Sequence, residues 1–157
     1  MNRVNAILQH KLFVESLKKI ADAEAERIFC KHDIEHFAAV ARIAYAMCLE
    51  EGCEVSKDIV YAAALLHDIG RWRQYLDGTP HEEESNRIAS IILPECGYTK
   101  SEVDLISYAI LEHRMQNGEK ADFAGCLYRA DKISRLCFVC PAISQCNWEI
   151  KITELVC

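Results

Sequence analysis

Apolar residues recur every three or four positions along most of this chain, the spacing typical of helices with one buried face. The first such pattern runs through Val4, Ile7, Leu8, Leu12, Leu17, Ile20 and Ile28 and predicts a helix over residues 4–28. A second helix is predicted from about Asp33 to Glu51, where Gly52 ends it. A third begins after Ser56 and ends near Gly70. No sustained alternation of apolar and polar residues indicates a strand, so the fold class is predicted to be all-α.

Residues 71–80, RWRQYLDGTP, are polar, aromatic and rich in turn formers, and we expect a loop there. Thr79 then predicts a helix start, because it is followed by a proline and, three positions later, by Glu82. Thr99 and Glu102 repeat this capping pattern before the next apolar run.

Further helices are predicted over about 120–139 and, after Pro141, about 143–155. The chain of 157 residues is long enough for one buried core, and it shows no internal repeat and no linker. We therefore expect a single domain over residues 1–157, a compact bundle of about six to seven helices.

Composition narrows the class of protein. Apolar residues make up 51% and charged residues 27% of the chain, as in globular proteins, and no apolar stretch reaches the ~18 residues of a membrane span. The first residues lack the apolar core of a secretory signal, so we expect a cytoplasmic protein with its nine cysteines reduced. A net charge of −6 argues against binding long nucleic acid but is compatible with a small phosphorylated ligand.

Residues 59–70 read IVYAAALLHDIG, so His67 and Asp68 end an apolar run that looks buried. Burying polar groups without partners costs about 2–7 kcal/mol each, so something must receive them. Candidate partners are His36, His81, His113 and Asp131, each in or next to another predicted helix. In a compact bundle such positions can converge on one point.

The segments HFAAVARIA, LLHDIGR, PHEEESNRIA, AILEH and ADK occur in this order. Their ordered set resembles the HD superfamily of metal-dependent phosphohydrolases, in its HDIG-like form, over about residues 30–135. The resemblance implies an all-helical fold with a metal held by His36, His67, Asp68 and Asp131.

The residue types agree with that implication. Imidazole nitrogens with carboxylate oxygens suit Mn, Fe, Co, Ni or Zn, and Mg less well. Two histidines and two aspartates would leave coordination positions open for water, as in catalytic sites. His36 matches the family spacing better than His32, four residues earlier, and we expect His32 and Glu35 near the metal ligands rather than among them.

His81 and His113 leave the number of ions open. Some HD phosphodiesterases carry additional histidines at comparable places and bind two ions bridged by the doublet aspartate. In that case His81 and His113 would hold a second ion, so the site would take one or two divalent ions per chain. In the alternative they line a single-metal pocket and contact phosphate.

The resemblance implies hydrolysis by a water that the metal at Asp68 activates. Arg71, directly after HDIG, and Lys132, directly after the last aspartate, are candidates for phosphate contact. Three other arginines are expected to be solvated surface residues: Arg73, Arg129 and Arg135.

The substrate does not transfer with the resemblance. The chain has HRMQNGEKADF where relatives specific for cyclic di-GMP carry Gly-Tyr-Pro, and it lacks the HDxxE form of nucleoside 5′-monophosphate phosphatases. We expect a phosphohydrolase acting on a small phosphate ester, a nucleotide, as a monoesterase or a diesterase. The alternatives are a non-catalytic regulatory module that binds metal or nucleotide, and an HD-like di-iron oxygenase. The sequence leaves the oligomeric state open.

Near the C-terminus, Cys137, Cys140 and Cys146 form a C-x2-C-x5-C array within a helix predicted over about 137–157. This spacing is compatible with a zinc or iron–sulfur site if a fourth ligand approaches. The candidates for that ligand are Cys30, Cys126 and Cys157. We favour the alternative, in which Cys137 and Cys140 share a helix face and pack as small apolar side chains.

Overall fold

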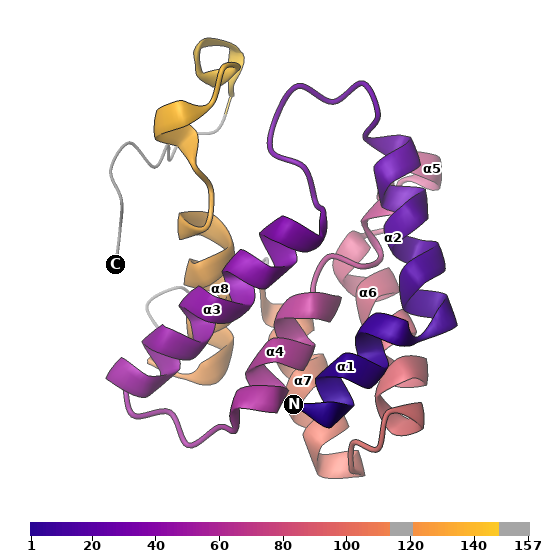
Figure 1. Cartoon of the computed structure of the whole chain (residues 1–157), viewed down its shortest axis with the longest axis vertical. Helices are drawn as coiled ribbons and strands as arrows, with labels where there is room; N and C mark the ends of the chain where they lie inside the picture. The colour runs from indigo at the N-terminus through magenta and orange to yellow at the C-terminus, as the bar shows by residue number, and fades with distance from the viewer. Residues whose placement is uncertain (114–120, 148–157) are drawn as a thin grey trace.

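The computed structural model describes residues 1–113 and 121–147, and these residues form only helices, turns and loops, which confirms the all-α prediction (Figure 1). In chain order the elements are α1 (Asn2–Gln9), α2 (Lys11–Ala23), α3 (Ile34–Glu50), α4 (Lys57–Leu66), α5 (Arg71–Asp77), α6 (His81–Glu95), α7 (Lys100–Glu112), α8 (Phe123–Ile133), and the short 3₁₀ helices η1 (Cys137–Val139) and η2 (Ile143–Gln145).

The core is built around α4, which contacts α1, α3, α6, α7 and α8. Its residues from Ile59 to Leu66 are buried apart from Tyr61, so this helix is apolar all round, as a central helix must be. Helix α3 lies along both α4 and α8, and it buries Phe37, Val40 and Ala44 at three- and four-residue spacing. The sequence period therefore predicts the buried face of α3 correctly.

Two predicted elements at the N-terminal end are different in the structure. The helix predicted over 4–28 is broken at His10, which ends α1 and caps α2 by accepting a hydrogen bond from the Leu12 amide at Nδ1. Helix α2 then ends at Ala23, and residues 24–33 form a loop in which Ile28 is exposed. The predicted helix extended too far because no glycine or proline lies between Ala23 and Ile28 to mark the helix end.

The expected loop over residues 71–80 was also wrong, because Arg71–Asp77 forms α5, which Gly78 ends with a left-handed φ of 81°. Helix α6 begins at His81 with Pro80 as N-cap, so Thr79 is not its cap. The Thr79 hydroxyl instead donates to Asp77 Oδ1 at 2.7 Å. The capping box of Thr99 and Glu102 on α7 is confirmed.

The C-terminal helices are shorter than predicted. Helix α8 covers Phe123–Ile133 and not 120–139, and the part of the 143–155 prediction within the described residues is the single 3₁₀ turn η2. Residues 148–157 lie outside the described part of the chain. In Figure 1 the 137–147 segment lies at the same end of the bundle as the 24–33 loop.

Candidate metal centre

Five helices bring the predicted metal-site side chains to this end of the bundle. These side chains are His36 on the first turn of α3, His67 and Asp68 directly after α4, His81 at the start of α6, His113 directly after α7, and Asp131 on the last turn of α8. All are buried except His36, which is half-buried.

The first cluster contains His36, His67, Asp68 and Asp131, each with one ligand atom within 4.8 Å of the others. His67 Nε2 lies 3.4 Å from Asp68 Oδ2 and 3.8 Å from Asp131 Oδ1, and His36 Nε2 lies 3.4 Å from the same Asp131 oxygen. Neither Nε2 atom has a hydrogen-bond partner, although both are buried. Buried polar atoms are normally paired, so these two nitrogens fit a metal ion as their missing partner.

The second cluster contains Asp68, His81 and His113, again with ligand atoms within 4.8 Å. Asp68 Oδ1 lies 2.9 Å from His81 Nε2 and 3.6 Å from His113 Nε2, yet makes no hydrogen bond. Asp68 therefore turns Oδ2 toward His67 in the first cluster and Oδ1 toward the second.

Helix ends orient two of the candidate ligand nitrogens. His67 directly follows α4, and its Nδ1 donates to the carbonyl of Ala64 at 2.7 Å. His113 directly follows α7, and its Nδ1 donates to the carbonyl of Ile110. Carbonyls in the last turn of a helix lack intrahelical partners, so they can accept these bonds. Each bond leaves the Nε2 lone pair directed at the centre, an arrangement common in metal sites.

The charges of the site favour a cation. Burial alone would raise the pKa of Asp68 and of Asp131, but the close approach of the surrounding histidines holds both pKa values well below their ordinary range. Burial lowers the pKa of His67, yet the two carboxylates outweigh it and raise that pKa to about 10. The centre thus attracts positive charge at His67 Nε2, which a divalent ion would supply.

A cavity of about 350 Å³ opens onto this centre, with Asp68, Asp131, His81 and His113 among its lining residues. The 24–33 loop and the 134–147 segment form its outer wall. Four cationic side chains line it: Arg27, Arg71, Lys132 and Arg135.

Arg71 and Lys132, the two residues predicted to contact phosphate, both lie against candidate metal ligands. Arg71 Nη1 is 2.8 Å from His81 Nδ1, and Lys132 Nζ is 2.5 Å from Asp131 Oδ2. Each cation therefore sits beside a candidate ligand and also faces the cavity.

The surface prediction for Arg135 was wrong. Its side chain is only 13% exposed, because it lines the cavity with Nη2 3.6 Å from Asp131 Oδ2. Arg129 is likewise half-buried, in an ion pair with Glu51. Arg73 is at the surface as predicted, paired with Asp77.

His32 lies next to the centre, with Nε2 3.7 Å from Asp68 Oδ2. Its Nδ1 is bonded to Glu24, a buried carboxylate that also accepts bonds from the His32 amide at 2.8 Å and from the Tyr75 hydroxyl at 2.6 Å. Burial would raise the pKa of Glu24, but its bonds to His32 hold it at about 2. Sequence reasoning missed Glu24, because no motif links a position before the loop to the centre.

Glu35 is not brought to the centre. It is exposed on the first turn of α3, because one step along a helix turns its side chain about 100° away from that of His36.

The C-terminal cysteines do not form a ligand group within the described residues. Cys137 is buried in η1, while Cys140 and Cys146 are half-buried, and Cys146 lines the cavity. The prediction that Cys137 and Cys140 share a helix face is wrong, because α8 ends at Ile133, before both of them. The three candidate fourth ligands are placed as follows: Cys30 is exposed, Cys126 lies beside Cys48 and Cys53, and Cys157 is outside the described residues.

Comparison with known proteins adds three findings. The family model for the HD domain matches residues 33–136. An uncharacterized protein of Clostridium beijerinckii is 45% identical over 148 residues, covering 94% of this chain and 93% of that protein. The crystal structure of a predicted HD superfamily hydrolase from an uncultured Thermotogales bacterium superposes with a TM-score of 0.56 at 32% identity, covering 76% of this chain and 66% of that one. Among residues 1–113 and 121–147, no helix has the length and apolar character needed to cross a membrane.

Proposed function

This chain belongs to the HD domain family, and from that premise we propose that it is a metal-dependent phosphohydrolase that acts on a small phosphate ester, with a nucleotide as substrate. One observation carries the proposal. Asp68 directs its two oxygens at two histidine clusters, beneath a cavity with four cationic side chains. Metal-dependent hydrolysis of a phosphate ester needs ligands for metal ions and positive charge for the phosphoryl oxygens, and the two clusters and the cationic side chains support both.

We assign one divalent ion to each cluster. His36, His67 and Asp131 would hold the first ion, His81 and His113 the second, and Asp68 would be shared between them. The alternative role for His81 and His113, direct contact with phosphate, is less well supported because their Nε2 atoms lie only 3.2 Å apart and share Asp68 Oδ1 as a neighbour. Divalent ions supply Lewis-acid polarisation of phosphoryl oxygens and lower the pKa of water.

The side chains that line the cavity would position the ester. Arg71 can offer two N–H groups to two phosphoryl oxygens, and Lys132 can act as a point charge. Both stand beside ligands of the ions, so a phosphate bound by them would be held next to the centre. These two cations would stabilise the negative charge that develops on the phosphate oxygens in the transition state.

The size and lining of the cavity support a small substrate. Its volume of about 350 Å³ is at the lower end of the range for ligand pockets. Phe29 on the 24–33 loop adds an aromatic surface to the lining, on which a base can stack. A nucleotide combines this aromatic contact with a phosphate for the cationic residues.

The test is phosphate release by the Mn²⁺-loaded full chain from a panel of nucleoside monophosphates, with bis(p-nitrophenyl) phosphate as a diester probe. We expect turnover of one substrate class and its loss in Asp68→Ala. Arg73→Ala is the matched control, because Arg73 is at the surface and bound to Asp77. Nucleotide binding without turnover would instead favour a regulatory module, and O₂ consumption by the Fe²⁺-loaded protein would favour an oxygenase.

A further inference from the structure

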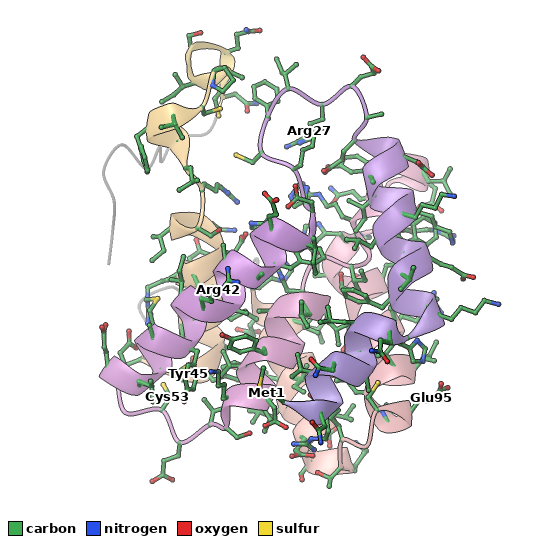
Figure 2. The ribbon with its side chains drawn as sticks, viewed as in Figure 1. Met1, Arg27, Arg42, Tyr45, Cys53 and Glu95 are labelled. Carbon is green, nitrogen blue, oxygen red and sulfur yellow. The ribbon has the colours of Figure 1, made fainter. Side chains whose placement is uncertain are left out.

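Three cysteine side chains meet at the end of α3 opposite to the histidine centre. Cys48 is on the last turn of α3, Cys53 follows that helix, and Cys126 is on α8. Their sulfur atoms lie within 4.8 Å of one another, and those of Cys53 and Cys126 are 3.9 Å apart. Figure 2 labels Cys53 at this end of α3, and Arg27 at the end where the 24–33 loop lies.

The end of α3 explains how two cysteines five positions apart come together. Gly52 has a φ of 68°, in the left-handed region that glycine favours. The amide of Cys53 donates to the carbonyl of Cys48 at 2.8 Å, and that of Gly52 to the carbonyl of Leu49 at 3.4 Å. These two bonds define a Schellman motif, in which the two outer residues usually make an apolar contact. Here both of those positions are cysteines, so the turn places one thiol near the other.

Glu51 brings a carboxylate next to one of the three sulfurs, although it is not within 4.8 Å of all of them. Glu51 Oε2 lies 3.6 Å from the Cys126 sulfur. In a tetrahedral zinc site with Zn–S near 2.3 Å and Zn–O near 2.1 Å, neighbouring sulfurs are about 3.8 Å apart and a sulfur and an oxygen about 3.6 Å apart. The Cys53–Cys126 and Glu51–Cys126 distances are close to both values.

A cationic side chain lies beside this group. Arg129 forms an ion pair with Glu51, and its Nη2 lies 3.5 Å from the Cys126 sulfur, so it would offset part of the negative charge of three thiolates and a carboxylate.

We propose that Cys48, Cys53 and Cys126 bind one thiophilic divalent ion of the zinc type, with Glu51, beside Cys126, turning toward the ion as fourth ligand. This site is separate from the histidine centre, since Cys48 is twelve positions after His36, about 18 Å along α3. Three thiolates together with Glu51 would close the coordination shell, which is typical of structural zinc. The ion joins α3 to α8, the two helices that carry His36 and Asp131.

The test is a Co²⁺ titration of the reduced, metal-free full chain. Thiolate ligands give Co²⁺ an intense near-ultraviolet charge-transfer absorption, which histidine and carboxylate ligands do not give. We expect this absorption to saturate at about one equivalent and to disappear when Zn²⁺ is added, as it does at tetrahedral thiolate sites. Its absence from the reduced wild-type chain would overturn the proposal.

Variants locate the thiolates. Cys53→Ala, at a half-exposed position, should remove the absorption while circular dichroism stays unchanged, and the matched control Cys96→Ala, at a buried thiol beyond α6, should retain it. Glu51→Gln should weaken Co²⁺ binding and alter the visible bands. Absorption that survives Cys53→Ala but is lost when the three C-terminal cysteines Cys137, Cys140 and Cys146 are replaced would place the ion there and refute the assignment. A Cys53–Cys126 disulfide in the freshly isolated protein would also refute it, because those sulfurs would then be unavailable as thiolates.

Discussion

Gly70 is packed so tightly that replacing it with alanine should disturb the metal centre. A Cβ atom there would meet the Ser85 amide nitrogen and would lie 2.7 Å from the Glu84 carbonyl carbon, both in the backbone of α6. Ordinary contacts of a Cβ atom begin at 3.4 Å, so α6 must move away by at least about 0.7 Å. The Gly70 amide also donates to Ser85 Oγ at 2.9 Å, and this bond would be strained or lost.

We expect Gly70→Ala to lower the free energy of unfolding by about 3 kcal/mol, from overpacking and the weakened hydrogen bond. Because α6 begins with His81, the shift should also separate His81 from Asp68, now 2.9 Å apart at Nε2 and Oδ1. A displacement of this order can reduce turnover by about 100-fold.

Urea unfolding followed by circular dichroism measures the first effect, on protein stripped of metal so that ion binding does not contribute. Ser85→Ala is the control, because it removes only the hydrogen bond and should cost about 1 kcal/mol. If the free energy of unfolding of Gly70→Ala lies within about 0.5 kcal/mol of that of the wild type and the variant binds the same amount of metal, Gly70 does not approach α6 as closely as described.

Three further predictions concern other parts of the chain. Arg71→Ala should raise KM about 10- to 100-fold with bound metal retained, since it removes a charged phosphate contact; metal loss in elemental analysis would make Arg71 structural instead. The pKa of Glu102 is lowered to about 2 by its bond from Arg3, so this pair stabilises the fold above pH ~4.5 and the stabilisation is lost as pH falls toward 2. Glu102→Gln keeps the capping geometry, and its unfolding free energy should fall less steeply over that range, by under about 1 kcal/mol in total; parallel pH profiles for the two proteins would contradict this. Cys137→Ser should leave the metal content unchanged, and a lost equivalent would return the C-terminal cysteines to consideration.

Much of the fold is predictable from local patterns, because the buried faces of α3 and α4 and the capping box of α7 are encoded in short stretches of sequence. Helix α5 was missed because its seven residues bury no side chain completely, so burial leaves no period to detect. The N-cap prediction at Thr79 failed because α6 begins at His81, one residue later than the capping pattern predicted, which makes Pro80 the N-cap.

The convergence of the histidines was predictable only from the ordered motifs, since their separations along the chain carry no geometric signal. His67 and His113 illustrate what the structure adds: both follow a helix and are oriented by a carbonyl three residues earlier. The contribution of Glu24 depends on how the 24–33 loop folds back, and the grouping of Cys126 with Cys48 depends on how α8 packs against α3. Neither arrangement has a local signature.

The central claim is that two divalent ions share Asp68, and metal quantification per chain tests it most directly. Each protein would be purified without chelator, and circular dichroism would confirm that each variant is folded. The metal content of each variant would be subtracted from that of the wild type, so that an ion bound elsewhere in the chain does not affect the result. We predict that His67→Ala and His81→Ala each lose about one equivalent and that Asp68→Ala loses about two, as expected for a shared ligand. Metal content and activity in Asp68→Ala equal to those of the wild type would contradict the account.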